Sequence, residues 1–309
     1  MKLFITGVSG LLGLNMALQL RDRYEVSGCY YSHTVATRGV QALKLDLTTG
    51  PEVDKVLHQI QPEIIVQTVG LTNVEACESD PGLAYLLNVE VARHTAELAR
   101  TLGAQLVHIS SDHLFDGKNP LQQEEDAPTP LNIYAKTKLR GEEVVLQSCP
   151  DALVIRTNFF GWGTGVRTSL SDWIINGLRE GRELNMFSDV FFTPIIITDL
   201  AELILRLVDR SATGIFNLGG AERLSKYDFA LKSAEIFNYS TDRIRAISVD
   251  DFSFNAQRPK DMSLSSNKAE GFLETPMPTV AESLKRLKTL ELDGYPKVLE
   301  QAVRQSAIL

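Results

Sequence analysis

The chain has 309 residues, of which 44% are hydrophobic and 23% are charged, and its formal net charge is −8 at pH 7. This is an ordinary globular composition, and its acidity argues against nucleic acid or an anionic membrane as a partner. The three cysteines lie far apart and form neither a CxxC motif nor a Cys/His cluster. We therefore expect no disulfide framework, no metal site and no membrane association, and a cytoplasmic location.

The first segment has the order strand, glycine-rich loop, helix. Residues 2–6 are apolar, as in a buried strand, and residues 11–20 have helical periodicity. Between them, Gly7, Gly10 and Gly13 have the spacing G-x-x-G-x-x-G. Glycines permit a tight turn and let the backbone approach a pyrophosphate, which the N–H groups of the new helix can bind. The segment is therefore predicted to hold a dinucleotide.

The next part of the chain alternates strands with helices. Strands are predicted over residues 25–30, 42–45, 64–68, 104–109 and 152–156, and helices over residues 52–60, 81–102 and 134–146. This alternation is typical of an α/β fold with a doubly wound parallel sheet and right-handed crossovers. Ligands of such sheets bind across the carboxyl ends of the strands. Gly7, Thr68, Ser110 and Asn158 follow predicted strands, so we expect them to meet at that edge.

The residues after the second strand bear on the choice of cofactor. A carboxylate at this point would bind the ribose 2′-hydroxyl and select NAD. The chain instead has Tyr31, Ser32 and His33, with Arg38 further on, and these side chains can accommodate a 2′-phosphate. The sequence therefore favours NADP(H) and leaves NAD(H) open. Asp46 lies where such folds contact the adenine, although the start of a helix accounts for it equally well.

A pair of serines, a tyrosine and a lysine mark the candidate reaction site. Ser110 and Ser111 follow the strand over 104–109, and Tyr134 and Lys138 lie one turn apart on the next helix. A free tyrosine has a pKa of about 10, so a nearby ammonium is expected to lower the pKa of Tyr134 toward the working range. A serine hydroxyl at the end of that strand can then hold the reacting oxygen.

After the sixth strand the alternation loosens. A glycine-rich loop is predicted over 161–165, helices over 170–180 and 199–208, and strands over 193–197 and 214–219. From residue 225 on, the chain is predicted to be helical except for a loop around 255–266.

This change in pattern suggests two regions. The expected division is a Rossmann domain that binds NAD(P), formed by residues 1–157 with 191–221, and a smaller substrate-binding region, formed by residues 158–190 with 222–309.

Several motifs together support a family resemblance. They include ISSDHLFDG at 109–117, EED at 124–126 before a Pro-x-Pro-Leu-Asn-x-Tyr run, YAKTKLRGE at 134–142, TNVEACE at 72–78 and RPK at 258–260. With these motifs the chain resembles, over essentially its whole length, the dTDP-4-dehydrorhamnose reductase family. That family is an extended short-chain dehydrogenase/reductase group, which also includes the regulatory beta subunit of methionine adenosyltransferase.

The resemblance implies a reaction and a role for each motif residue. Ser111 would polarise the substrate carbonyl, Tyr134 would donate the proton, and Lys138 would bind the nicotinamide ribose and tune Tyr134. The reaction would be hydride transfer from NAD(P)H to the C4 ketone of a nucleotide-linked deoxysugar, such as dTDP-4-dehydro-L-rhamnose. The residues assigned to the cofactor are Gly7, Ser9, Gly10, Leu11, Leu12, Gly13, Tyr31, Ser32, His33, Arg38, Asp46, Leu47, Thr68, Val69, Gly70, Ser110, Tyr134 and Lys138.

The chain departs from the family pattern where the substrate would lie. The family often has Asn-Ala-Ala where this chain has Thr68-Val69-Gly70, and Leu71 replaces a tyrosine. After Arg-Thr, Asn158 and Phe159 replace Ser-Trp. Arg258 can grip a nucleotide diphosphate with its guanidinium, although a surface arginine before a turn proline is an equal interpretation. The residues assigned to the substrate are Leu71, Ser111, His113, Tyr134, Asn158, Phe159 and Arg258.

Three functions remain open at this point. The leading one is reduction of a sugar nucleotide, which would be the small-molecule partner. An epimerase or dehydratase can use the same fold, but dehydratases commonly have Asp-Glu after the catalytic hydroxyl, where this chain has Asp112-His113. The third is a non-catalytic regulatory subunit that binds NADP, similar to the methionine adenosyltransferase beta subunit. A homodimer is an expectation from analogy with the fold class alone.

Overall fold

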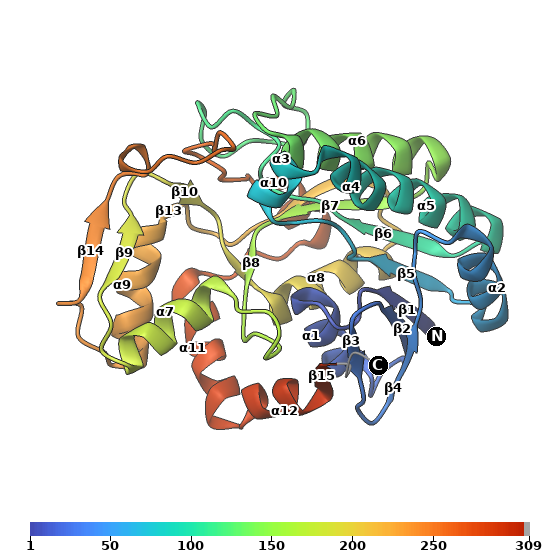
Figure 1. Cartoon of the computed structure of the whole chain (residues 1–309), viewed down its shortest axis with the longest axis horizontal. Helices are drawn as coiled ribbons and strands as arrows, with labels where there is room; N and C mark the ends of the chain where they lie inside the picture. Colours follow the sequence, from blue (N-terminus) through green and yellow to red (C-terminus); the bar gives the residue numbers. More distant parts are fainter. Residues whose placement is uncertain (306–309) are drawn as a thin grey trace.

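The structure is a computed structural model, and it describes residues 1–305. A seven-stranded sheet forms its centre, with the strand order β12-β7-β6-β5-β1-β2-β4 (Figure 1). The strands are β1 (Lys2–Thr6), β2 (Glu25–Tyr30), β4 (Val40–Lys44), β5 (Ile64–Gln67), β6 (Gln105–Ile109), β7 (Leu153–Thr157) and β12 (Gly214–Leu218). Every neighbouring pair is parallel. The predicted doubly wound parallel sheet is therefore confirmed.

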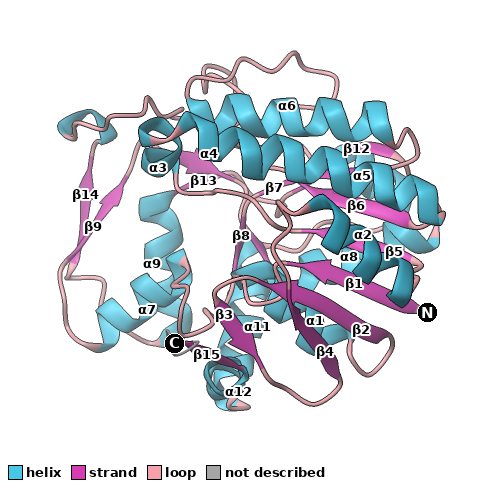
Figure 2. Cartoon of the chain, turned by 45° about the vertical axis from the view of Figure 1, so that its right-hand side comes forward, coloured by secondary structure: helices cyan, strands magenta, loops and turns pink. Residues whose placement is uncertain are grey.

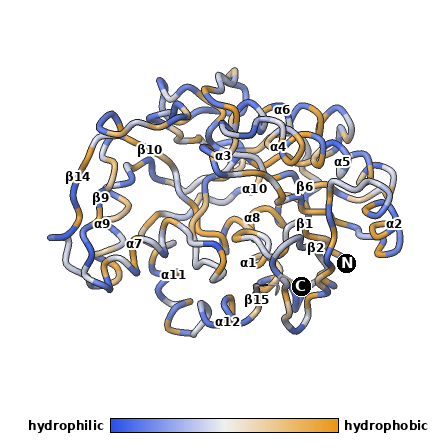
Figure 3. The backbone as a smooth tube through the Cα atoms, in the orientation of Figure 1, coloured by the Kyte–Doolittle hydropathy of each residue, from blue (hydrophilic) through white to orange (hydrophobic). Residues whose placement is uncertain are grey.

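The sheet separates two hydrophobic cores because successive residues of a strand point to opposite faces. In β1, Leu3 and Ile5 belong to one core and Phe4 to the other. Strands covered on both faces are apolar at nearly every position, which is why the central strands are largely orange in Figure 3. The helices that cover the first face are α1 (Leu11–Leu20) and α8 (Ile197–Asp209), and those that cover the second are α2 (Gly50–Ile60), α5 (Val91–Leu102) and α6 (Ile133–Ser148) (Figure 2).

A buried ion pair connects α6 to the sheet. Arg156 in β7 donates hydrogen bonds from Nε and Nη2 to the carboxylate of Glu142 in α6, and Nη2 lies 2.8 Å from Oε2. The two side chains are only 3% and 2% exposed. This pair fixes the helix that contains Tyr134 and Lys138 relative to the strand that precedes Asn158.

The chain leaves the sheet after β7 and returns to it as β12. Most of a smaller region is built from the segment between these two strands and from the segment after β12 (Figure 1). This region contains α7 (Leu170–Arg179), β9 (Leu184–Phe187), α9 (Lys226–Phe237) and β14 (Ile244–Ile247). Short strands form three further pairs, which are β8 (Phe159–Phe160) with β11 (Ile195–Ile196), β10 (Phe191–Phe192) with β13 (Leu224–Ser225), and β3 (His33–Val35) with β15 (Val303–Gln305). The remaining helices after β14 are the 3-10 turn Val249–Asp251, α10 (Asn267–Leu273), α11 (Val280–Leu292) and α12 (Tyr295–Ala302).

Three of the predicted elements need correction. The chain after residue 225 is not helical throughout, since β14 pairs in parallel with β9, a distant partner that local periodicity does not reveal. The predicted strand over 193–197 shrinks to β11, because Pro194 has no N–H to donate and Ile197 already begins α8. The predicted helix over 81–102 is divided into α4 (Pro81–Tyr85), a π-helical turn (Leu86–Glu90) and α5.

One helix, α3 (Val74–Ser79), was not predicted, and Asn73 caps it by accepting a hydrogen bond from the Ala76 N–H. Among residues 1–305, no helix is both long and apolar enough to cross a bilayer.

Candidate active site

The glycine-rich loop between β1 and α1 leaves the first N–H groups of α1 uncapped beside a close backbone turn. Gly7 has a φ of +69°, which a glycine adopts without strain. A Cβ on Gly13 would lie 2.3 Å from the Gly7 carbonyl oxygen, so only glycine allows α1 to begin this close to the loop. The N-cap residue of α1 is Gly10, which has no side chain to cap the first N–H groups. These groups are therefore available to an anion.

The end of β5 lies directly against this loop. A Cβ on Gly7 would lie 2.9 Å from Cγ2 of Val69 and 3.1 Å from Oγ1 of Thr68. The Thr68 N–H donates to the Thr6 hydroxyl at 3.0 Å. A Cβ on Gly70 would lie 2.7 Å from Oδ1 of Asn88. The structure thus brings residues 68–70 and the loop together, as expected for strands that end at the same edge.

Other residues that were assigned to the cofactor differ in their burial. Leu12 is buried in the core beneath α1, whereas Ser9 and Leu11 are half-buried at its start. Leu47 is likewise buried, in the core under α2. Asp46 accepts hydrogen bonds at Oδ1 from the N–H and the hydroxyl of Thr48, at 2.9 Å and 2.7 Å. Asp46 therefore stabilises the turn before α2, in agreement with the helix-start interpretation.

The residues after β2 separate into two groups. Tyr31 and Ser32 are exposed at the carboxyl end of β2, and His33 begins β3. Arg38 lies elsewhere, because its carbonyl accepts a hydrogen bond at 3.2 Å from Arg21, the residue that ends α1. A helix of ten residues is about 15 Å long, so Arg38 lies near the opposite edge of the sheet from the glycine-rich loop. The structure therefore does not bring Arg38 to this site.

A cation that was not predicted lies at the correct edge. Lys44, the last residue of β4, pairs with Tyr30, the last residue of β2. The position of Lys44 depends on the register between β2 and β4. These strands pair in the sheet, but β3 lies between them in the sequence, so no local sequence pattern gives that register.

Ser111, Tyr134 and Lys138 meet beyond the carboxyl end of β6. Lys138 donates from Nζ to the carbonyl oxygen of Ile109, the last residue of β6, at 2.7 Å. Ser111 lies close enough to Tyr134 to influence the pKa of the phenol. The N–H of Ser110 donates to the Ile155 carbonyl at 2.7 Å and so joins β6 to β7. These residues are all buried, with Tyr134 7% and Lys138 5% exposed.

The pKa of Tyr134 differs from the sequence expectation. Burial raises this pKa above the ordinary value, Ser111 opposes the increase, and the charge of Asp112 adds to it. Lys138 is not among the groups that shift it, so the expectation that Lys138 lowers this pKa is wrong for this arrangement. Burial instead lowers the pKa of Lys138 itself to about 8. Tyr134 therefore stays protonated at neutral pH, as a proton donor must.

A polar cluster borders this group. Asn158 donates from Nδ2 to Oδ2 of Asp112 at 2.5 Å, and the Ser111 hydroxyl lies 3.3 Å from Oδ1. The ring of His113 meets the ring of Tyr134 edge to face, with centroids 5.5 Å apart. Burial lowers the pKa of His113, so its imidazole is neutral at pH 7.

Two asparagines that were not predicted to act at the site hold α6, the helix of Tyr134 and Lys138, in place. Asn132 caps α6 by accepting a hydrogen bond from the Ala135 N–H at 2.9 Å, and it donates to the Gln257 carbonyl at 2.8 Å. Asn88, in the π-helical turn, accepts from the Leu71 N–H at 2.7 Å and donates to the Thr137 hydroxyl at 3.0 Å. An asparagine just before a helical pattern is a readable cap signal, whereas the contacts of Asn88 are not.

The remaining predicted substrate residues surround this cluster at different depths. Leu71 packs with Tyr134 and Ala256 in a small hydrophobic cluster. Phe159 is half-buried in β8. Arg258 forms an ion pair from Nη2 to Oε1 of Glu75 at 3.0 Å. Lys226, the first residue of α9, was not predicted, and its charge lowers the pKa of His113.

Comparison with known proteins agrees with this architecture. The model of the RmlD substrate binding domain family matches residues 1–291 of the chain. The chain belongs to this family.

Several named proteins are similar to the chain over most of its length. A solved structure of dTDP-4-dehydrorhamnose reductase from Bacillus anthracis in complex with NADP has a TM-score of 0.83 and 27% identity, and the match covers 94% of this chain and 99% of that one. The Haloferax volcanii protein named "Probable low-salt glycan biosynthesis reductase Agl14" is 28% identical, over 93% of this chain and 97% of that protein. Methionine adenosyltransferase 2 subunit beta of Rattus norvegicus is 31% identical, over 87% of this chain and 81% of that protein.

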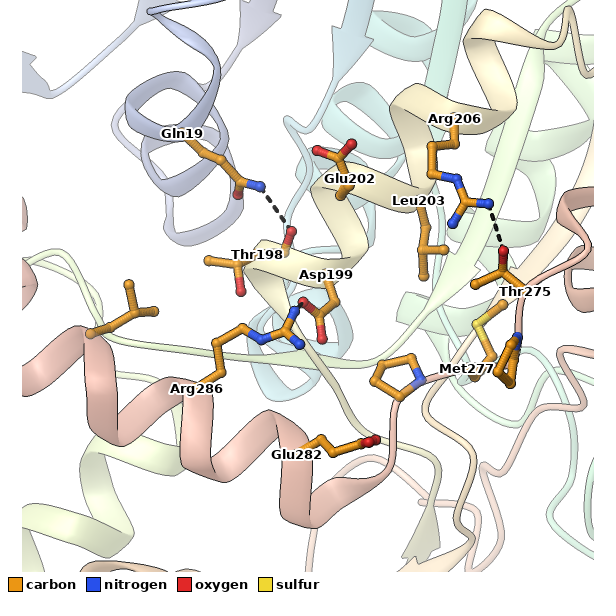
Figure 4. A pocket seen from close by; sticks show the side chains of 13 residues that line it. Gln19, Thr198, Asp199, Glu202, Leu203, Arg206, Thr275, Met277, Glu282 and Arg286 are labelled. Carbon is orange, nitrogen blue, oxygen red and sulfur yellow. Dashed lines mark hydrogen bonds and ion pairs between the residues drawn. The ribbon is translucent and has the colours of Figure 1, made fainter.

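A separate cavity of about 560 Å³ lies on the α1 and α8 side of this RmlD-family fold (Figure 4). Arg286 on α11 reaches across it to form an ion pair with Asp199 on α8, and Gln19 on α1 donates to the Thr198 carbonyl at 3.0 Å. None of the residues predicted for the cofactor or the substrate lines this cavity. We therefore do not assign the reaction of the RmlD family to it.

Replacement of Lys138 by methionine is expected to stabilise the protein at pH 7. Because the pKa of Lys138 is lowered to about 8 in the folded protein, the unfolded chain binds this proton more tightly than the folded protein does. Lys138 therefore lowers the free energy of unfolding by its full amount below pH 8, and this loss disappears as the pH rises toward about 10.4. The pKa shift of Lys138 corresponds to about 3 kcal/mol in the free energy of unfolding. The substitution also removes the hydrogen bond to the Ile109 carbonyl, which costs about 1 kcal/mol of that gain. We expect Lys138→Met to raise the free energy of unfolding by about 2 kcal/mol at pH 7.

The measurement is urea unfolding at pH 7 and pH 10. The gain of Lys138→Met over the wild type should shrink at the higher pH. Lys136→Met provides the matched control, because Lys136 is exposed on the same helix and its replacement should change stability by less than about 0.5 kcal/mol. A Lys138→Met gain that is the same at both pH values would contradict a buried, charged lysine.

Proposed function

We propose that the chain reduces the C4 ketone of a nucleotide-linked deoxysugar with NADPH, with dTDP-4-dehydro-L-rhamnose as the first candidate substrate. The observation that supports this most is the convergence of Ser111, Tyr134 and Lys138 beyond β6, at the same sheet edge as the glycine-rich loop. Membership of the RmlD family and the NADP complex of the Bacillus anthracis reductase support the same reaction class.

Each residue has a defined task in this proposal. Tyr134, which burial keeps protonated, donates its proton to the carbonyl oxygen of the substrate. Ser111 holds that oxygen by a hydrogen bond, and Lys138 binds the nicotinamide ribose. The cofactor, when bound, supplies the hydride to the carbonyl carbon. Fixing both partners in one geometry would provide a large share of the acceleration.

The proposed cofactor contacts follow the geometry of the sheet edge. The loop of Gly7, Gly10 and Gly13 would hold the pyrophosphate, and residues 68–70 would border the nicotinamide half. Ser32, His33 and Lys44 are the proposed contacts of a 2′-phosphate, and NADP(H) is therefore the preferred cofactor. We also propose that residues 1–157 with 191–221 bind the cofactor and that residues 158–190 with 222–309 bind the substrate. Residues 306–309 of that range lie outside the described part of the chain.

The test is a steady-state assay of NADPH and NADH oxidation with dTDP-4-dehydro-L-rhamnose. We expect turnover with both partners present, none without the sugar nucleotide, and a higher kcat/KM for NADPH than for NADH. Failure to oxidise either cofactor with this and related keto-sugar nucleotides would contradict the proposal.

A regulatory subunit is the second candidate, and the methionine adenosyltransferase relative is the specific observation that favours it. Such a subunit would form a stoichiometric complex with a methionine adenosyltransferase catalytic subunit and would not turn over a sugar nucleotide. Co-purification of the two chains, combined with the oxidation assay, separates the two functions. A homodimer remains a prediction, to be checked by light scattering.

A further inference from the structure

Strand β3 stands apart from the central sheet and pairs with the last strand of the chain. It follows β2 in sequence, yet it does not belong to the seven-stranded sheet, and among residues 1–305 its only strand partner is β15. The register places Val303 opposite Val35 and Gln305 opposite His33. Figure 2 shows β15 directly beside β3. The placement of β3 therefore depends on a segment from the other end of the chain.

Apolar packing holds the two strands together at one end. Val35 and Val303 are 5% and 6% exposed, and both belong to the hydrophobic core that contains the buried residues of α1. Leu299 on α12, just before β15, is fully buried in the same core. Facing β-branched side chains of this kind stabilise a short strand pair. β15 therefore starts from a fixed point.

A backbone ladder continues from this point along β3. The Ala36 N–H donates to the Ala302 carbonyl at 2.8 Å. In an antiparallel ladder the pairs that exchange hydrogen bonds alternate, so we expect Arg304 and Thr34 to be the next exchanging pair. By the same alternation, we expect the N–H of Gln305 to point away from β3.

The ladder runs toward the proposed cofactor site. Because the strands are antiparallel, β15 extends toward the carboxyl end of β2, where Tyr31 and Ser32 are exposed and His33 begins β3. The connection beyond β3 is held at its other end by Arg21, which donates to the Thr37 hydroxyl at 3.1 Å. Of these two supports, only β15 reaches the residues proposed to contact a 2′-phosphate.

His33 has an unsatisfied group at this end of β3. Its Nδ1 is buried and has no hydrogen-bond partner among the described residues. A buried polar nitrogen without a partner is costly, and a phosphate oxygen is an acceptor that would satisfy an imidazole N–H. The strand that β15 holds therefore presents a group that an anion would complete.

We propose that β15 is a strap that positions residues 31–33 for the 2′-phosphate of NADP(H). The preference for NADP(H) over NAD(H) then depends on the pairing of β15 with β3. This inference rests on the proposed function, because it takes Ser32 and His33 to be contacts of that phosphate. NAD(H) carries a hydroxyl at the same position, so it has less to gain from a fixed β3.

The physical reason is preorganisation. A free segment of three residues loses conformational freedom when it orders around a phosphate, and that loss weakens binding. A segment held by β15 has already lost this freedom on folding. The glycine-rich loop and residues 68–70 follow β1 and β5 of the central sheet, so their positions do not depend on β15.

The test measures the binding of NADP⁺ and NAD⁺ to the full-length chain by calorimetric titration, in the wild type and in Arg304→Pro. Proline removes the backbone N–H of residue 304 and interrupts the ladder, while Val303 stays in the core. We expect Arg304→Pro to weaken NADP⁺ binding about tenfold or more and NAD⁺ binding less than about threefold. The pair 2′,5′-ADP and AMP should show the same difference, because only the first carries the 2′-phosphate.

Two matched variants separate the ladder from other effects of the substitution. Gln305→Pro introduces the same ring one residue later, where the N–H is expected to point away from β3. Arg304→Ala removes the side chain but keeps the N–H. Both should bind NADP⁺ within about threefold of the wild type. Hydrogen exchange followed by mass spectrometry should be faster over residues 31–36 in Arg304→Pro and unchanged in the other two variants.

Four results would overturn the inference. Faster exchange over residues 31–36 with unchanged NADP⁺ binding would show that the phosphate does not need a fixed β3. Unchanged exchange in Arg304→Pro would show that β3 does not depend on β15. Equal losses for NADP⁺ and NAD⁺ would report a distorted fold, and an equal loss of NADP⁺ binding in Arg304→Ala would assign the effect to the side chain.

The binding readout distinguishes this inference from the proposed function. A preference for NADP⁺ that Arg304→Pro abolishes, without turnover of any keto-sugar nucleotide, would support the strap and contradict the reductase. Wild-type turnover together with an unchanged ratio of kcat/KM for NADPH and NADH in Arg304→Pro would support the reductase and contradict the strap. If both hold, that ratio should fall about tenfold in Arg304→Pro.

Discussion

Tyr134→Phe is expected to lower kcat for the proposed reduction by about a thousandfold, within the range observed when a general acid is removed. The substitution deletes only the phenolic hydroxyl. The phenylalanine ring can still pack with Leu71 and Ala256 and against the edge of His113. Cofactor binding and stability should therefore stay close to wild type, and the loss should appear in single-turnover oxidation of NADPH.

Tyr295→Phe is the matched control for this experiment. The hydroxyl of Tyr295 is also buried, but it has no hydrogen-bond partner among the described residues, and Tyr295 lies on α12, away from the catalytic helix. Its removal should leave kcat unchanged. If Tyr134→Phe kept more than about a tenth of the wild-type kcat, Tyr134 could not be the proton donor.

Glu142→Ala is expected to lower the free energy of unfolding by about 3–5 kcal/mol, because it leaves the Arg156 guanidinium buried without its counter-charge. Arg156 is 2% exposed and its Nη1 already has no partner, so neither water nor another carboxylate of the described residues can take the place of Glu142. Urea unfolding followed by circular dichroism at pH 7 provides the measurement.

The same helix supplies the control. Glu143 forms an ion pair with Arg140 at 2.7 Å, and both side chains are nearly half exposed. Glu143→Ala should therefore cost less than about 1 kcal/mol. Replacing both buried partners, as in Glu142→Leu with Arg156→Met, should recover most of the stability lost in Glu142→Ala. A loss in Glu142→Ala as small as that in Glu143→Ala would show that Arg156 reaches water.

The sheet was predictable because its strands and helices have strong local patterns. The apolar run of β1, the glycine spacing and the helical period of α1 follow one another without ambiguity, and their predicted bounds agree with Lys2–Thr6 and Leu11–Leu20. β14 was not predictable, because it is four residues long, two of them exposed, and it exists as a strand only through its pairing with β9. Tertiary pairing overrides local propensity in such short strands.

The same distinction applies to the candidate site. Ser111, Tyr134 and Lys138 are close in sequence, and the topology brings them together as the pattern predicted. Arg38 was misplaced because the chain between β2 and β4 turns back toward the end of α1, which its sequence does not indicate. Lys226 was missed because the groups whose charges interact with it, Asp112 and His113, lie more than a hundred residues earlier in the chain.

The π-helical turn at Leu86–Glu90 places a constraint on how this protein can change during evolution. Each residue of a helix adds about 100° of rotation, so the wide turn sets both the direction of Asn88 and the face that α5 presents to the sheet. Loss of one residue would rotate either Asn88 or α5 away from its present direction. In the first case Leu71 and Thr137 would lose their hydrogen bonds with the Asn88 side chain, and in the second α5 would expose its apolar side. The exposed positions Tyr85 and Leu86 can therefore vary in residue type, whereas an insertion or deletion beside them cannot be accommodated.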